Sequence, residues 1–239
     1  MLQTPDLTTQ IGEFEVSFFQ DACWIHITHS ESGNSVFEAS ASQLVQTGYG
    51  NAEKIASKIV KNGQFWSNPE AKAWSKESIC ANFEVGETSW GSPKVLLTGQ
   101  TLTPTRRNFL VNNYTPLDFS VEISEARDGG SLALTASIDD PEDLADFLAL
   151  NYDSPSDEEI YGMGFQYTEW NFRGKRVPVV TSEGGIGRGL EPLTFLMNVA
   201  GRQGGNTMTT YAPSYSHITS RNRGFIFHTP AAGYLDFSK

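Results

Sequence analysis

The sequence predicts a mainly β protein, an antiparallel β-sandwich with one or two short helices. Short runs of aromatic and β-branched residues recur along the chain, and Gly, Pro, Asn or Asp bounds most of them. Aromatic residues make up 12% of the 239 residues, and these side chains favour the half-buried surface of a sheet. No long Pro-, Gly- or Ser-rich linker interrupts the pattern, so we expect residues 1–239 to form a single domain.

The first expected element is a β-hairpin near the N-terminus. Residues 14–19 (FEVSFF) and 23–29 (CWIHITH) are short aromatic and β-branched runs separated by three residues, which predicts two paired strands. Residues 30–35 (SESGNS) predict a turn, and residues 36–40 (VFEAS) predict a further short strand.

A helix is expected at residues 51–63, where the apolar period changes. Apolar side chains recur three and four positions apart, at Ala52, Ile55, Ala56, Ile59 and Val60. This spacing places them on one face of a helix, and Gly63 is a typical end signal.

Three strong strands are expected in the middle of the chain, at residues 94–102, 117–124 and 131–138. The last two are joined by EARDGGS at 125–131, a good hairpin turn. Farther on, residues 192–200 (PLTFLMNVA) look like a strand, and residues 216–220 and 224–229 look like a pair of strands.

An acidic segment follows the middle strands. Residues 139–159 hold nine Asp and Glu residues and no basic residue, which is most simply a solvated surface. Within it, residues 140–152 could form a short helix with Asp140 as its cap and Pro141 at its first position.

Charge and composition exclude several classes of function. The net charge of −11 argues against a nucleic-acid partner and against binding to an anionic membrane. The chain shows no signal peptide and no long apolar run, so we expect a cytoplasmic protein without a membrane partner. Cys23 and Cys80 are expected to be reduced, buried thiols, and we expect neither a metal site nor a cofactor.

Residues 161–189 combine many glycines with charged side chains, which raises the possibility of a phosphate cradle. Two pairs of glycines begin the G-x-G-x-x-G pattern, but Tyr167 and Leu190 occupy the two positions of the third glycine. The β-rich context is also wrong for that motif, so nucleotide binding is excluded as a prediction. The glycines are better explained as tight turns that pass close to another surface.

The segment YGMGFQYTEWNFRGKRVPVVTSEGGIGRGLEPLT at 161–194, with GGNTMTTYAPSYSHITSRNRGFIF at 204–227, resembles glycoside hydrolase family 31. The likeness is to the N-terminal domain in the branch of bacterial sulfoquinovosidases and related α-glucosidases, and it is good over residues 120–230. The resemblance implies a galactose-mutarotase-like β-sandwich that precedes a (β/α)8 barrel. In the family, the barrel performs retaining hydrolysis of α-glycosides.

Two departures from the family pattern matter. Phe165 stands where relatives carry a glutamate after the second glycine. None of the five Trp residues is followed by x-Asp, so the family's nucleophile motif on the barrel is absent from this chain. Retaining hydrolysis requires two carboxyl groups flanking the scissile bond, and we therefore predict no catalytic residue here and no activity of this chain alone.

The resemblance implies that one group of side chains faces the mouth of the barrel and helps to wall the sugar pocket. Its members are Gln166, Tyr167, Glu169, Trp170, Arg173 and Arg188. The expected partners are then an α-glycoside and the catalytic barrel of the parent protein. The simpler alternative is that Arg173, Lys175 and Arg176 are solvated turn residues and Trp170 belongs to the core.

Two other functions remain open from the sequence. A free-standing carbohydrate-binding module would bind sugars as the isolated chain. A mutarotase-like sugar epimerase would need a general base and a general acid converging in a cleft. The candidates for that pair are His217 with Glu169 or Glu183.

Overall fold

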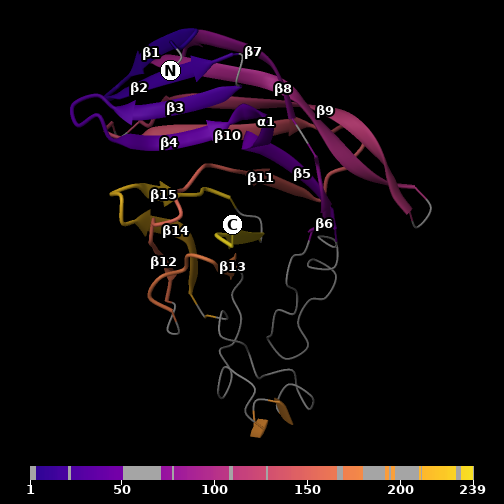
Figure 1. The fold of residues 1–239 in the computed structure, drawn as a ribbon. Coiled ribbons are helices and arrows are strands. Elements are labelled where there is room, and N and C mark those ends of the chain that lie inside the picture. Colours follow the sequence, from indigo (N-terminus) through magenta and orange to yellow (C-terminus); the bar gives the residue numbers. More distant parts are fainter. Residues whose placement is uncertain are drawn as a thin grey trace. The chain divides into compact units, whose positions relative to one another are not determined.

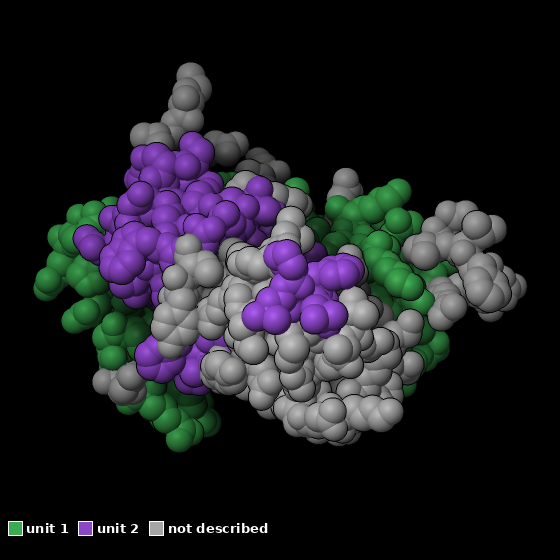
Figure 2. Space-filling model, turned by 90° about the horizontal axis from the view of Figure 1, so that it is seen from below, with its two compact units in different colours: residues 1–50, 71–154 green, residues 51–70, 155–239 purple. Residues whose placement is uncertain are grey.

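The computed structural model describes residues 4–20, 23–50, 71–76, 78–107, 110–127, 129–165, 169–179, 192–193, 195–196, 210, 212–229 and 233–238. This part of the chain is dominated by antiparallel strands, so the predicted mainly β fold is confirmed. The chain forms two compact units, residues 1–50 with 71–154 and residues 51–70 with 155–239 (Figure 2). The arrangement of residues 1–239 as one domain stays a prediction.

The first unit contains three antiparallel sheets, whose strands run side by side in Figure 1. One sheet has the spatial order β1 (Leu7–Ile11), β2 (Phe14–Phe19), β3 (Trp24–His29) and β4 (Ser35–Ser40). A second has the order β10 (Leu132–Asp139), β9 (Leu110–Glu125), β8 (Pro93–Arg107) and β7 (Ser78–Glu87). The third contains β11 (Phe147–Leu150), β5 (Val45–Gly50) and β6 (Ala71–Trp74), and β5 follows a single helical turn, α1 (Ala41–Leu44).

The core of the first unit forms because alternate residues of the strands are apolar. The register places Val16 opposite Ile27 in one sheet and Leu97 opposite Val121 in another, and all four are 0% exposed. Phe18 of β2 stacks on a ring of β7, with centroids 4.2 Å apart, so apolar faces of the two four-stranded sheets meet. This face-to-face arrangement is the predicted β-sandwich.

The strands expected from the sequence in this unit are confirmed. The N-terminal hairpin is β2 paired with β3, and the segments 94–102, 117–124 and 131–138 lie in β8, β9 and β10. The helix expected at 51–63 lies outside the described residues. Helix α1 was not predicted, because four residues are too few to show a helical period.

The short helix expected at 140–152 is wrong. The carboxylate of Asp140 does act as a cap, accepting hydrogen bonds from the backbone N–H groups of Leu144 (2.9 Å) and Ala145 (2.8 Å), but it closes a turn. The chain then enters β11, which pairs with β5. Pairing with an existing strand satisfies the backbone more completely than an isolated helical turn, and it overrides the local propensity.

The second unit has smaller sheets (Figure 1). One joins β12 (Ile160–Gly164), β14 (Pro213–Thr219) and β15 (Gly224–Ile226), and the other pairs β13 (Arg176–Val179) with β16 (Gly233–Asp236). The expected strand pair near the C-terminus is confirmed by β14 and β15. The strand expected at 192–200 is wrong for its described residues, which are helical at 192–193 and 195–196.

A small apolar cluster holds the second unit together. Its buried members are Ile160, Met163, Phe172, Val177 and Phe237. They come from β12, β13 and the segments that flank β13 and β16, so the cluster fixes both ends of the loop that contains Trp170. Within the described residues, no helix combines the length and the apolar character that crossing a membrane requires.

Candidate functional site

The candidate site begins where β12 ends in a glycine-rich bulge. Gly162, Met163 and Gly164 all have positive φ angles, of 114°, 62° and 82°. A Cβ on Gly164 would overlap the carbonyl oxygen of Ala212 and lie 2.9 Å from the backbone nitrogen of Ser214. Glycine is therefore required at this position both for its backbone conformation and for the close approach of the neighbouring chain.

Asn171 fixes the loop that follows the bulge. Its side-chain oxygen accepts hydrogen bonds from the backbone N–H groups of Ile160 (3.0 Å) and Arg173 (2.9 Å). The next residue, Phe172, is 1% exposed in the apolar cluster, and its N–H donates to the carbonyl of Ile160 at 2.8 Å. The loop tip is thus held on a rigid base rather than by its own side chains.

The tip carries exposed aromatic side chains. Trp170 is 84% exposed and its ring lies 6.0 Å from that of Tyr161, with a tilted geometry. Phe165, at the position of the family glutamate, is 64% exposed. The alternative that placed Trp170 in the core is therefore wrong.

The charged side chains of this loop have local partners. Glu169 pairs with Lys175 at 2.9 Å, and the guanidinium of Arg176 lies 3.5 Å from the centre of the Tyr234 ring. Arg173 is half-buried and lies close enough to Asp157 to contribute to lowering the pKa of that carboxyl group. Gln166, Tyr167, Glu183 and Arg188 lie outside the described residues, so the structure brings together Glu169, Trp170 and Arg173 of the predicted set.

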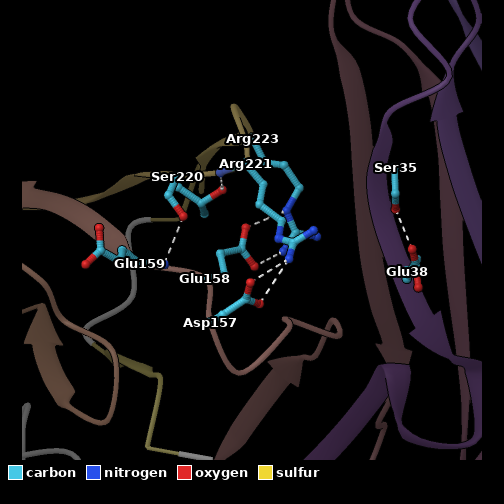
Figure 3. A network of polar contacts seen from close by, with 9 residues as sticks. Ser35, Glu38, Asp157, Glu158, Glu159, Ser220, Arg221 and Arg223 are labelled. Carbon is cyan, nitrogen blue, oxygen red and sulfur yellow. Dashed lines mark hydrogen bonds and ion pairs between the residues drawn. The ribbon is translucent and has the colours of Figure 1, made fainter.

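The end of the acidic segment meets a basic turn within the second unit (Figure 3). The carboxylate of Asp157 accepts two hydrogen bonds of 3.0 Å from the guanidinium of Arg221. Glu158 accepts a 2.9 Å hydrogen bond from Nε of Arg223 and a second, short one from its terminal nitrogen. The backbone N–H of Glu159 donates to the hydroxyl of Ser220 at 3.0 Å.

Part of this segment is not a solvated surface, which corrects the expectation from its composition. Glu158 is 1% exposed and Arg223 is 5% exposed. A bidentate pair of this kind compensates for the loss of hydration only while both partners are present. At the surface, the hydrogen bonds from Arg221 are the main reason why the pKa of Asp157 is lowered.

His217 lies beside this ion pair in an aromatic stack. Its ring centroid is 4.8 Å from that of Phe225 and 5.1 Å from that of Phe237, and the residue is 2% exposed. Burial, assisted by the positive charge of Arg223, lowers its pKa to about 4. A catalytic base must reach a substrate proton, and a histidine enclosed in this way is poorly placed for that role. The carboxylate that influences its charge is Glu158, whereas the mutarotase hypothesis proposed Glu169 or Glu183.

Sequence reasoning missed the pair of Glu158 and Arg223. The available signal was the run of three acids at 157–159 together with two arginines in SRNRG at 220–224. Complementary charge in two distant segments does not reveal which members are buried, so the pair is identified by its geometry alone.

A second candidate surface lies on the four-stranded sheet β10-β9-β8-β7 of the first unit. A depression of about 600 Å³ is lined by polar side chains and by Ile79, which is 59% exposed. Along its floor, Gln100 donates to Asp118 at 2.8 Å, and the hydroxyls of Ser120 and Ser137 are 2.8 Å apart. Amide, hydroxyl and carboxylate groups of this kind can exchange hydrogen bonds with sugar hydroxyls.

In the part of the chain that the structure describes, no group of three or more His, Cys, Asp or Glu side chains is arranged to hold a metal ion. The two units therefore offer an aromatic loop tip and a polar sheet depression as the candidate sites.

Comparison with known proteins gives the family context. No family model matches the chain. A sulfoquinovosidase from Agrobacterium fabrum (strain C58) is 32% identical over 111 residues, which cover 46% of this chain and 16% of that protein. A solved structure, a GH31 family sulfoquinovosidase from E. rectale in complex with the aza-sugar inhibitor IFGSQ, matches with a TM-score of 0.51 and 14% identity.

That structural match covers 98% of this chain and 29% of the solved chain. At this identity the match concerns the fold, and it agrees with the β-sandwich seen here. The present chain thus spans a minor part of the length of both relatives. The resemblance inferred from the sequence motifs is confirmed: this chain is similar in sequence and in fold to part of the sulfoquinovosidases of glycoside hydrolase family 31.

Proposed function

We propose that this chain is the N-terminal accessory β-sandwich of a retaining α-glycosidase, either an α-glucosidase or a sulfoquinovosidase-like enzyme. The observation that carries the proposal is the 32% identity to a sulfoquinovosidase over 111 residues. In this proposal the sandwich docks on a catalytic barrel and shapes its sugar pocket. The chain performs no chemistry alone, because the family's nucleophile motif is absent from it.

The loop tip at Trp170 is the part proposed to wall the sugar pocket. Its indole is 84% exposed although the loop base is fixed by Asn171 and Phe172, so the ring is presented by a rigid support. An aromatic ring offers a flat apolar face to a sugar, and the indole N–H can donate a hydrogen bond. Glu169 and Arg173, with Gln166, Tyr167 and Arg188, remain the proposed neighbours of this ring.

An exposed apolar face of the second unit supports docking on a barrel. The register of β14 and β15 places Ile226 opposite Ser216 and Ile218 opposite Gly224, so both isoleucines lie on the same face of the sheet. They are 71% and 60% exposed. Contiguous exposed apolar side chains are typical of an interface, and the relatives are several times longer than this chain. We infer that the barrel of the parent protein covers this face.

The test is the activity of the longer gene product. It should hydrolyse a chromogenic α-glucoside or α-sulfoquinovoside, and the present chain should hydrolyse neither. Replacing Trp170 with Ala should lower kcat/KM by about tenfold, the value of one aromatic contact. Trp90, which is 48% exposed in the first unit, is the matched control, and Trp90→Ala should leave kcat/KM unchanged. Hydrolysis by the short chain, or equal rates for both variants and the parent, would contradict the proposal.

A second candidate is a free-standing carbohydrate-binding module, which the polar depression around Gln100 and Asp118 favours. Calorimetric titration of the chain with methyl α-glucoside should then give heat that saturates, and Gln100→Ala should abolish it. An absence of saturable heat would remove this candidate. A mutarotase-like reaction is less well supported because His217 is enclosed by aromatic rings. The cytoplasmic location stays a prediction.

A further inference from the structure

The two cysteines of the chain lie together, although 56 residues separate them in the sequence. Cys23 lies in the turn between β2 and β3, and Cys80 lies in β7 of the other four-stranded sheet. Both line a cavity of about 210 Å³, together with Phe18 and Phe83, whose rings stack across the same junction. The cavity therefore places one thiol from each sheet at a shared position.

The two thiols are in hydrogen-bond contact, and both side chains are partly exposed. The expectation that they are buried is therefore wrong. Small reagents have access to them, since the cavity is open to solvent along residues such as Asp6 and Gln20.

We propose that Cys23 and Cys80 form a thiol–disulfide modification site, at which a low-molecular-weight disulfide such as oxidised glutathione creates a reversible bond between the two sheets. Cys23 Sγ attacks one sulfur of the oxidant, which releases the first glutathione thiol and leaves a mixed disulfide. Cys80 Sγ then attacks Cys23 Sγ and releases the second glutathione. The protein loses two hydrogen atoms and two electrons, and the oxidant gains both.

The backbone at both positions departs from a regular ladder. Cys23 has a φ angle of 48°, and the register of β7 shifts between Cys80 and Asn82. Turns and bulges release the backbone from strict strand pairing, so the two Cβ atoms can adjust toward the narrow separation that a disulfide requires.

The order of the two attacks follows from the environment of Cys80. Burial, with the neighbouring Cys23 as a smaller contribution, raises the pKa of the Cys80 thiol to about 12. Its thiolate is therefore scarce at neutral pH, and the thiolate is the species that attacks a disulfide. We expect the first exchange at Cys23, followed by a slower internal step.

A bond between these positions would close a loop that includes β3 to β6 and part of β7. In the chain-entropy description such a loop destabilises the unfolded state enough to raise Tm by roughly 10 °C. Added reductant should reverse this increase. The site is independent of the proposed glycosidase role, because it lies in the first unit and needs no sugar.

The test is to incubate the full chain with oxidised glutathione and to measure its intact mass, its non-reducing peptide map and its Tm. The expected product is a monomer lighter by two hydrogen atoms, with the Cys23 and Cys80 peptides joined and a higher Tm. In Cys80→Ser the reaction should stop at a stable glutathione adduct on Cys23. In Cys23→Ser the remaining thiol should react more slowly than Cys23 does in the first variant.

Three results would overturn the proposal. They are a parent protein that carries two glutathione adducts, a dimer joined between chains, and two free thiols after prolonged oxidation. Labelling both thiols in urea before and after the reaction confirms that each cysteine was chemically available, so a negative result counts against the site itself.

Discussion

The two units of this protein bury different kinds of polar side chain. In the described part of the first unit, the buried polar residues are all Ser or Thr, as at Thr47 and Thr103, whose hydroxyls are 2.7 Å apart. In the described part of the second unit they include three ionisable residues, Glu158, His217 and Arg223.

This difference shows how each unit obtains its structure. Alternating apolar residues on long paired strands are enough to define the first unit, and neutral hydroxyls satisfy one another inside it. The second unit has shorter strands, and a buried ion pair joins the segment before β12 to the turn before β15. Removing one partner of such a pair leaves a buried charge, so we expect the second unit to be the more sensitive to single changes and to pH.

The largest effect is expected from breaking the buried pair. Glu158→Gln should lower the free energy of unfolding by about 3–5 kcal/mol, because Arg223 would keep its charge without a compensating carboxylate. The matched change in the first unit, Thr103→Val, should cost about 1–3 kcal/mol, since it leaves only a neutral hydroxyl without its partner. Urea denaturation of both variants measures the difference. A smaller loss for Glu158→Gln than for Thr103→Val would refute the comparison.

The next effect concerns pH. The folded-state pKa of His217, about 4, lies below the ordinary value of 6.5, so between these values the unfolded chain binds a proton that the folded chain does not. Stability from this group is therefore complete above pH 6.5 and is lost as the pH falls to 4, by about 3 kcal/mol.

His217→Phe keeps an aromatic ring in the stack and removes this titration. Subtracting the stability–pH profile of the variant from that of the parent isolates the contribution of His217 from those of the many carboxylates. The difference should be flat above pH 6.5 and should change steeply below it. A flat difference between pH 4 and 7 would show that the histidine is not buried in its neutral form.

Two glycines with nearly equal backbone angles provide a smaller and sharper test. Gly164 and Gly174 have φ angles of 82° and 78°, but only Gly164 has neighbouring backbone where a Cβ would be placed. Gly174→Ala should cost about 1 kcal/mol for the unfavourable angle alone. Gly164→Ala should cost about 2–3 kcal/mol, because the strand must also move away from Ala212. Equal Tm values for the two variants would show that the bulge is not as tightly enclosed as described.

The smallest effect is expected at the loop tip. Trp170→Ala should change the free energy of unfolding by less than about 0.5 kcal/mol, since the side chain is 84% exposed. Together with a tenfold loss of kcat/KM in the longer product, this result would separate a role in the sugar pocket from a role in folding. If the variant is instead strongly destabilised, the ring belongs to the folded core of the unit.

The sequence predicted the first unit better than the second. Residues 14–19 and 94–102 alternate apolar and polar side chains strongly enough to identify β2 and β8 without further information. The segment at 140–152 misled because its cap residue, Asp140, closes a turn as readily as it begins a helix. Whether a side chain such as Glu158 is buried depends on a partner 65 positions away, which no local pattern contains.

The candidate site was predicted only in part, for a similar reason. The motif resemblance identified the loop that carries Glu169, Trp170 and Arg173, and the exposure of Trp170 agrees with a role at an interface. It gave no indication of Asn171, although this side chain fixes the loop base through two backbone hydrogen bonds. Nor did it indicate that Cys23 and Cys80 share a cavity, because contact between two sheets is a property of the complete fold.

The measurement that tests the central claim most directly is to sequence the encoding transcript beyond the codon for Lys239. The account predicts an open reading frame that continues into a (β/α)8 barrel carrying a Trp-x-Asp-Met-Asn-Glu motif, with this chain as its N-terminal sandwich. A stop codon immediately after Lys239 would contradict that claim, and sugar binding by the chain alone would then become the function to measure.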